Sequence, residues 1–263
     1  MTISQKSTIG IFLLLFVVLY FGFDTKPKDH GQIEKSRALK MSTTDVSILK
    51  KEAKEVLTNV QKGKIDLINA QLASAPDTIQ KIQFMKELSG AWYEFGFPSI
   101  AGNYAEKIAE VENTDDAWGI AATTYSIGIG RSRTEKESAF CKEKAMKAFD
   151  IAISLDSENI RHQINKAVTL ADHPDADNPM KGILQLLDLN KSYPENVSVL
   201  NQLAKLGMKT NQWDKALERL KKALSLQPEN ITSNCLMAEV LLNSNQSADA
   251  EKYKIKCESL MKK

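Results

Sequence analysis

The chain has 263 residues, a length that suits one or two domains. Its 12 glycines and 7 prolines make up about 7% of the residues, against an average near 12%. This count excludes collagen-like and low-complexity classes, and an all-β sandwich or barrel would need more of these turn residues. The formal net charge is +2, and the part from residue 44 onward is nearly neutral, which gives no electrostatic reason to bind nucleic acid. The composition therefore favours a helical protein with short connections.

The N-terminal part of the chain contains an uncharged apolar run at residues 9–23, IGIFLLLFVVLYFGF. Its 15 residues fall short of the roughly 20 that span a bilayer as a helix, so Ser7 and Thr8 must join the helix or flanking lysines must extend to the headgroups. No cleavage site of the small-x-small type follows the run. We therefore expect a short tail at residues 1–8 and an uncleaved single-pass transmembrane anchor at residues 9–23. A signal peptide with a poor cleavage site is the alternative.

Charges and cysteines bear on the side of the membrane that the rest of the chain occupies. Four basic residues lie between positions 26 and 37, whereas Lys6 is the basic side chain before the apolar run. The positive-inside rule then places the C-terminal part in the cytoplasm, and a conventional N-terminal signal anchor would place it outside. Cys141, Cys235 and Cys257 are an odd number with no close pair, which argues against a disulfide scaffold and favours a reducing compartment. These signals narrowly favour a cytoplasmic over an extracytoplasmic or periplasmic location.

Residues 24–43 are polar and include Pro27 and Gly31, so we expect a flexible linker. From residue 44 onward apolar residues recur at steps of three and four, which is the spacing of one helix face. Residues 44–76 fit no repeat clearly and are expected to form a divergent repeat or an N-terminal cap. The predicted helices are a first through Val46–Val60 ending at Gly63, a second through Ile65–Leu72 ending at Pro76, and a third through Ile79–Trp92 ending at Gly96–Pro98.

A sequence unit recurs at a period of 34 residues in the C-terminal half. Pro194-Glu195-Asn196 and Pro228-Glu229-Asn230 are 34 residues apart, as are Ala216 and Ala250. A third copy, Ser157-Glu158-Asn159, begins 37 residues before Pro194, so we expect a short insertion at residues 173–177. The asparagine of the repeated Pro-Glu-Asn turn, Asn196 or Asn230, is expected to cap the helix that follows. A period of this length indicates stacked supersecondary units.

A 34-residue unit of two helices resembles the tetratricopeptide repeat family. That family places small residues where two helices touch closely, aromatics or Leu where they interdigitate, and Pro at the closing turn. The best repeat matches at Leu200, Leu203, Ala204, Ala216, Leu220, Ala223 and Pro228, and carries Gly207 where an aromatic is usual. An upstream repeat matches at Trp118, Ala121, Ala122, Tyr125, Ala145, Phe149 and Ala152, with an enlarged loop expected around residues 127–137, and a degenerate copy matches at Leu88, Trp92, Ala101 and Ala105. The resemblance covers residues 77–263 and implies an all-α, right-handed α-solenoid of helix pairs.

The residue patterns predict no catalytic, metal or cofactor site. The histidines, His30, His162 and His173, have no ligand spacing with a cysteine or carboxylate. The acids at positions 175 and 177 are two residues apart, as acidic ligands in a calcium loop are, but the Glu that ends such a loop is absent. The glycines at 128 and 130 lie beside two arginines and could hold a phosphate, yet the ending of a phosphate loop is missing, so a flexible insertion between helices is expected there. The sequence therefore predicts a protein that is not an enzyme.

In the family that this chain resembles, the first helix of each repeat lines a concave surface that takes extended peptides or partner helices. The resemblance implies a membrane-tethered scaffold or adaptor that binds protein partners, although the family's carboxylate clamp is not cleanly matched. Three alternatives remain open: a peptide-binding chaperone of the envelope or secretion pathway, an accessory subunit of an enzyme, and self-association through the terminal repeat. By helical phase, the candidate partner-binding residues are Lys86, Tyr93, Thr123, Arg161, Asn165, Asn201 and Lys205.

Overall fold

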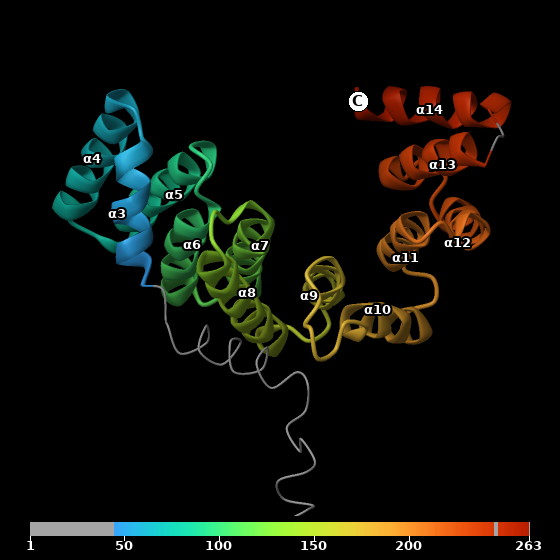
Figure 1. The fold of residues 1–263 in the computed structure, drawn as a ribbon, viewed down its shortest axis with the longest axis horizontal. Coiled ribbons are helices and arrows are strands. Elements are labelled where there is room, and N and C mark those ends of the chain that lie inside the picture. The colour runs from blue at the N-terminus through green and yellow to red at the C-terminus, as the bar shows by residue number, and fades with distance from the viewer. Residues whose placement is uncertain (1–44, 245–246, 263) are drawn as a thin grey trace, which may run out of the picture. The chain divides into compact units, whose positions relative to one another are not determined.

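Every regular element in the described part of the chain is a helix (Figure 1). The computed structural model describes residues 45–244 and 247–262. Within these ranges the all-helical prediction is confirmed. The helices are α3 (Val46–Val56), α4 (Asn59–Ser74), α5 (Thr78–Glu94), α6 (Pro98–Glu112), α7 (Asp115–Arg131), α8 (Glu135–Leu155), α9 (Ile160–Asp172), α10 (Lys181–Ser192), α11 (Val197–Lys209), α12 (Trp213–Leu226), α13 (Ile231–Asn243) and α14 (Ser247–Met261).

The predicted tail, anchor and linker at residues 1–8, 9–23 and 24–43 lie outside the described residues. Among the helices that are described, none combines the length and the apolar composition needed to cross a bilayer.

The helices from α5 onward form pairs, and each pair packs on the next. The pairs are α5 with α6, α7 with α8, α9 with α10, α11 with α12, and α13 with α14. The second helix of each pair contacts the first helix of the following pair, and the first helices α7, α9, α11 and α13 also contact one another in sequence. This is the packing that stacked helix-pair repeats require, because one pair alone cannot bury its apolar face.

The two helices that precede the pairs cover the first of them. Helix α3 lies on α6 and α4 lies on α5, and their apolar residues join the core cluster that contains Leu88 and Trp92.

Asparagines at the repeated turns cap the helices that follow them, as predicted. The side chain of Asn196 accepts a hydrogen bond from the backbone N–H of Val199 (3.1 Å), and Asn230 accepts from Ser233 (3.0 Å). In the third copy, Asn159 accepts from the backbone N–H two residues later at 3.3 Å. Each cap satisfies a donor that the first turn of a helix leaves without a partner. The recurring Asn is therefore explained by local backbone chemistry.

The cores of the pairs include residues that the repeat pattern singled out. Tyr125, Ala145, Phe149 and Ala152 are fully buried between α7 and α8. Leu88 and Trp92 of α5 are equally inaccessible. Small residues mark the close contacts: a Cβ atom added to Gly182 would lie 2.3 Å from the backbone N of Ala171, so α10 approaches α9 more closely there than any side chain permits.

The first predicted helix boundary is wrong. The chain breaks at Leu57 rather than at Gly63, and Gly63 lies inside α4. The cause is a capping box: Thr58 Oγ1 accepts from the backbone N–H of Gln61 (3.3 Å), and Gln61 Oε1 accepts from the backbone N–H of Thr58 (2.9 Å). Val60, which the apolar spacing assigned to the first helix, is 83% exposed in the second.

The enlarged loop expected around residues 127–137 is also wrong. Helix α7 continues to Arg131 and α8 begins at Glu135, so this repeat is lengthened by longer helices and the connection is short. Gly128 is buried in α7, where an added Cβ atom would lie 2.7 Å from the thiol sulfur of Cys141. Gly128 is therefore a helix-packing position and Gly130 is an exposed residue of the same helix, so the phosphate-loop and flexible-insertion interpretations both fail. The insertion expected at residues 173–177 does lie in the connection between α9 and α10.

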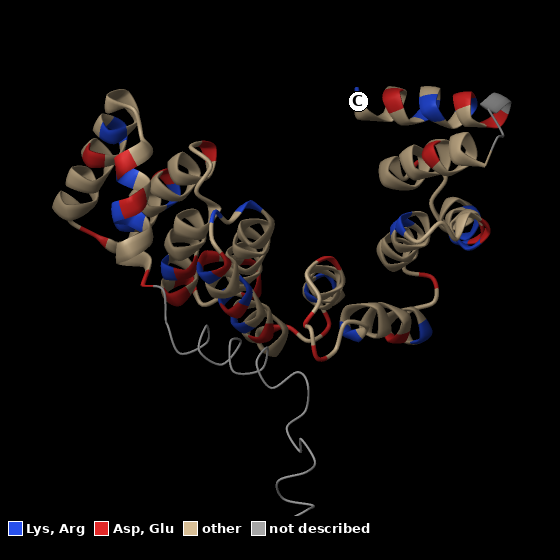
Figure 2. Cartoon of the chain, viewed as in Figure 1, with Lys and Arg blue, Asp and Glu red and all other residues tan. Residues whose placement is uncertain are grey.

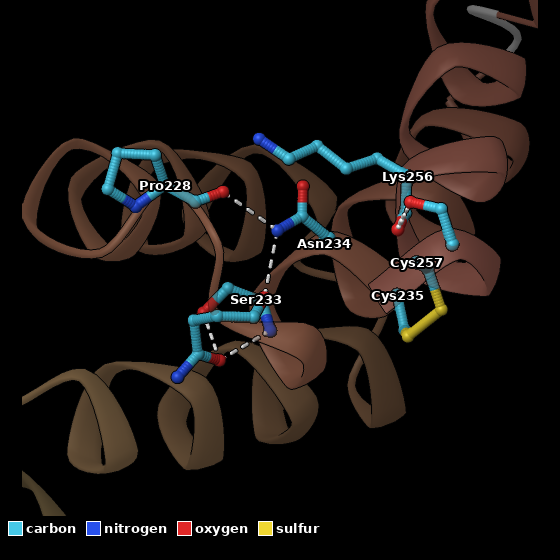
Figure 3. The surroundings of a disulfide bond; sticks show 8 residues. Pro228, Ser233, Asn234, Cys235, Lys256 and Cys257 are labelled. Atoms are coloured by element: carbon cyan, nitrogen blue, oxygen red, sulfur yellow. Dashed lines mark hydrogen bonds between the residues drawn. A yellow bond between two sulfur atoms is a disulfide. The ribbon is translucent and has the colours of Figure 1, made fainter. Parts of the chain in front are cut away.

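Two of the three cysteines pair with each other, which their spacing in the sequence did not predict. Cys235 of α13 and Cys257 of α14 form a disulfide, with their Cα atoms 5.1 Å apart (Figure 3). They are 22 residues apart in the sequence, but the helical hairpin brings the start of α13 beside the end of α14. Cys141 is the remaining cysteine, and it is buried.

Candidate functional site

A pocket of about 350 Å³ opens between the first helices of two successive pairs, α7 and α9. Three of the predicted partner-binding residues line it: Thr123 from α7, and Arg161 and Asn165 from α9. The other lining residues are Asp116, Gly119, Ile120 and His162. Helical phase thus identified three of the seven lining residues, and the packing of α7 on α9 brings them to one pocket.

Helix α7 supplies one face of the pocket through residues three and four positions apart. Asp116, Ile120 and Thr123 follow this spacing and so share one side of the helix. The hydroxyl of Thr123 donates to the backbone carbonyl oxygen of Gly119 (2.8 Å). Ile120 is 61% exposed, although it is a large apolar side chain. Ile120 thus places an apolar side chain in contact with water at the edge of a pocket that is otherwise lined mainly by polar residues.

The charged side chains around the pocket form an ion pair that is exposed to solvent. Arg161 forms an ion pair with Asp116, and both side chains are more than 60% exposed. Exposed ion pairs contribute about 0–1 kcal/mol to stability. A charged group of a partner can therefore form an ion pair with either side chain, because breaking the existing pair costs the fold little stability. Acidic and basic residues are interspersed along the helices as a whole (Figure 2).

Below the pocket, a buried histidine joins α9 to α7. The Nε2 atom of His162 lies 2.9 Å from Oδ2 of Asp115, and the amide of Asn159 donates to the same oxygen at 2.9 Å. These hydrogen bonds, that of His162 first, hold the pKa of the Asp115 carboxyl below its usual range. A Cβ atom on Gly119 would lie 2.7 Å from Nδ1 of His162, so glycine makes room for the ring. This contact fixes the distance between the two helices that form the pocket.

Asp115, Asp116 and His162 could also offer ligand atoms to a metal ion, because these atoms lie within 4.8 Å of one another. Sequence spacing missed this cluster, since the acids and the histidine are more than forty positions apart. Aligning the first turns of α7 and α9 by repeat register would have brought them together. In this structure Arg161 contacts the carboxylate of Asp116 and Asn159 contacts that of Asp115.

The remaining predicted residues lie elsewhere. Lys86 forms an ion pair with Glu112 (3.0 Å) beside a separate open pocket that also includes the exposed Ile79. The ring of Tyr93 lies 5.5 Å from the guanidinium of Arg131. Lys205 is exposed on α11.

Asn201 has to be corrected as a partner-binding candidate. It is 4% exposed, and its side chain donates to Asn230 (3.3 Å) and accepts from the hydroxyl of Ser233 (2.9 Å). These bonds join α11 to the first turn of α13. Because they occupy the amide, Asn201 stabilises the repeat contact and is not available to a partner.

Comparisons with known proteins agree with this architecture. No family model matches the sequence. Among solved structures, TTC0263, a thermophilic TPR protein in Thermus thermophilus, aligns with a TM-score of 0.50 at 15% identity and covers 69% of this chain and 91% of its own. PilW, a widely conserved type IV pilus biogenesis factor, aligns at 18% identity with a TM-score of 0.45, covering 70% of this chain and 79% of its own. MamA of Desulfovibrio magneticus, from residue 41 to its end, aligns at 16% identity with a TM-score of 0.41, covering 69% and 96%.

At these identities the comparison bears on the fold alone, and it rests on the first of the three structures. The paired helices, the capped turns and this similarity lead to one conclusion: the chain has the fold of the tetratricopeptide repeat family.

Proposed function

We propose that the protein is a non-catalytic scaffold that binds a protein partner on the surface formed by α7 and α9. The observation that carries this proposal is Ile120, which is 61% exposed at a pocket bordered by Thr123 and Arg161. Association is favoured when an apolar side chain loses its contact with water, and the polar groups around it give orientation and specificity.

The same proposal includes tethering to a membrane through the apolar run at residues 9–23. A polar linker at residues 24–43 has a root-mean-square reach of about 25 Å if it behaves as a flexible chain. Confinement within that distance of a bilayer raises the effective concentration of the binding surface toward any membrane-bound partner. The support for this part is the amino-acid sequence.

An aspartate in place of Ile120 is expected to reduce partner binding at least about tenfold, because a charge replaces the apolar contact. The full-length protein and its Ile120→Asp variant should be captured from cells after chemical crosslinking, and the partner quantified by mass spectrometry. Val111→Asp is the matched control, because Val111 is a 50% exposed apolar residue on the second helix α6.

The helical circular dichroism of both variants should equal that of the unmodified protein. Equal recovery of every partner with Ile120→Asp and Val111→Asp would contradict the proposed binding surface.

A further inference from the structure

The disulfide lies at the open end of the last helical hairpin. Helices α13 and α14 are joined by their connecting residues at one end, and the bond between Cys235 and Cys257 joins them at the other (Figure 3). Helix α14 packs chiefly on α13 and has no following repeat on its other side within the described chain. A helix that packs on a single neighbour opens most easily, so a covalent link at this position restrains the opening that packing restrains least.

The bond attaches α14 to a part of α13 that side-chain hydrogen bonds hold in place. Next to Cys235, the amide of Asn234 donates to the carbonyl oxygens of Pro228 (3.1 Å) and Asn230 (2.8 Å). Ser233, which precedes it, donates to Asn201 of the preceding pair at 2.9 Å. The first turn of α13 is thereby fixed to α11, and the disulfide extends this fixed point to α14.

Other uses of this cysteine pair do not fit the surroundings. Among the described residues, the metal-capable cluster consists of Asp115, Asp116 and His162 and includes no cysteine. A zinc site built on Cys235 and Cys257 would need two more ligands. The two sulfur atoms are already bonded to each other. The arrangement therefore points to a structural role.

The third cysteine is protected from exchange with this pair. Cys141 is fully buried, and burial raises the pKa of its thiol to about 12, with the Glu137 charge adding to the effect. Because the thiolate is the species that attacks a disulfide, a thiol that stays protonated is a poor competitor. Cys141 can therefore remain reduced in the same molecule.

We propose that residues 45–263 fold in an oxidising compartment, outside the cytoplasm, where the Cys235–Cys257 bond locks the last helix pair. The two thiols together lose two protons and two electrons to a protein disulfide donor, which is released as a dithiol while the new S–S bond forms. Structural disulfides persist in such compartments and are rare in the cytoplasm. This location reverses the one that the sequence narrowly favoured, and it gives the apolar run at residues 9–23 the orientation of a conventional signal anchor.

The test is to count free thiols in the full-length protein taken directly from cells. Cells are quenched in acid, the denatured protein is treated with a maleimide-polyethylene glycol before or after reduction, and the tags are counted by gel shift. The unmodified protein should carry one tag before reduction and three after, one for each cysteine. Cys141→Ala should carry none before reduction and two after. Cys257→Ser, the control, should carry two in both conditions. Three tags on the unmodified protein before reduction would overturn the proposal.

Two further readouts separate the location from the locking role. A phosphatase reporter that is active only when its own disulfides form, fused after Lys263, should be active, and a full-length inactive fusion would overturn the location. Reduction of the native protein should accelerate trypsin cleavage at the lysines of α14 at least about tenfold. Cleavage at an unchanged rate would overturn the locking role.

Discussion

Replacing Phe149 with alanine is expected to lower the free energy of unfolding by about 3–5 kcal/mol. Phe149 is fully buried in the cluster that α7 and α8 share with Tyr125, and the neighbouring positions 145 and 152 on its own helix are alanines with no exposed surface. Truncation removes the favourable free energy of burying the aromatic ring. It also leaves a cavity, because the short alanine side chains nearby cannot fill the space.

Urea unfolding of the full-length protein, followed by far-UV circular dichroism, measures this loss. Leu155→Ala is the control on the same helix, since Leu155 is 43% exposed; it should change the free energy of unfolding by less than about 1 kcal/mol. If the two variants lost similar small amounts, Phe149 would not lie in the core of this repeat.

Replacing Lys144 with methionine is expected to cost roughly 3 kcal/mol. Glu106 is 7% exposed and accepts hydrogen bonds from Lys144 Nζ (2.8 and 3.0 Å) and from the hydroxyl of Tyr125 (2.7 Å). Three helices, α6, α7 and α8, meet at this carboxylate. Without Lys144 the carboxylate stays buried with no opposite charge beside it, which is far more costly than the loss of an exposed pair.

A double-variant comparison distinguishes this buried charge from simple loss of packing. Adding Glu106→Gln to Lys144→Met should recover a large part of the stability, because a neutral amide still accepts the Tyr125 hydrogen bond and leaves no charge unpaired. Lys54→Met is the exposed control: Lys54 pairs with Asp66 at 2.8 Å, the two side chains are 47% and 62% exposed, and the expected cost is under about 1 kcal/mol. Equal costs for Lys144→Met and Lys54→Met would contradict the buried network.

The repeat positions could be predicted from the sequence because their causes are local or periodic. Asn196 and Asn230 cap helices through backbone donors three residues away, so the turn itself contains the information. The buried aromatic and alanine positions recur at helical spacing. The predictions at Gly63 and Gly128 failed for one reason: a glycine in a sequence suggests a break in a helix. Gly63 instead lies inside a helix that a capping box begins. Gly128 lies inside α7, where the missing side chain leaves room for a cysteine of the facing helix.

The candidate site could be predicted in part for the same reason. Helical phase identified Thr123, Arg161 and Asn165 as residues on one side of first helices, but it could not show that α7 and α9 bring them to one pocket. Asn201 shares that phase, yet the following pair lies over it and buries it. Such neighbour contacts, like the disulfide of the last pair, depend on packing between elements far apart in sequence.

We propose that the surface between α7 and α9 contacts a protein partner, and photo-crosslinking from that surface tests this contact. A photo-crosslinking amino acid is placed at position 120 of the full-length protein in intact cells, with position 111 on α6 as the control. We expect light to produce a discrete heavier species that contains a second protein at position 120 and not at position 111. The same product from both positions, or none from position 120 in cells where the partner is co-captured with the unmodified protein, would contradict the claim.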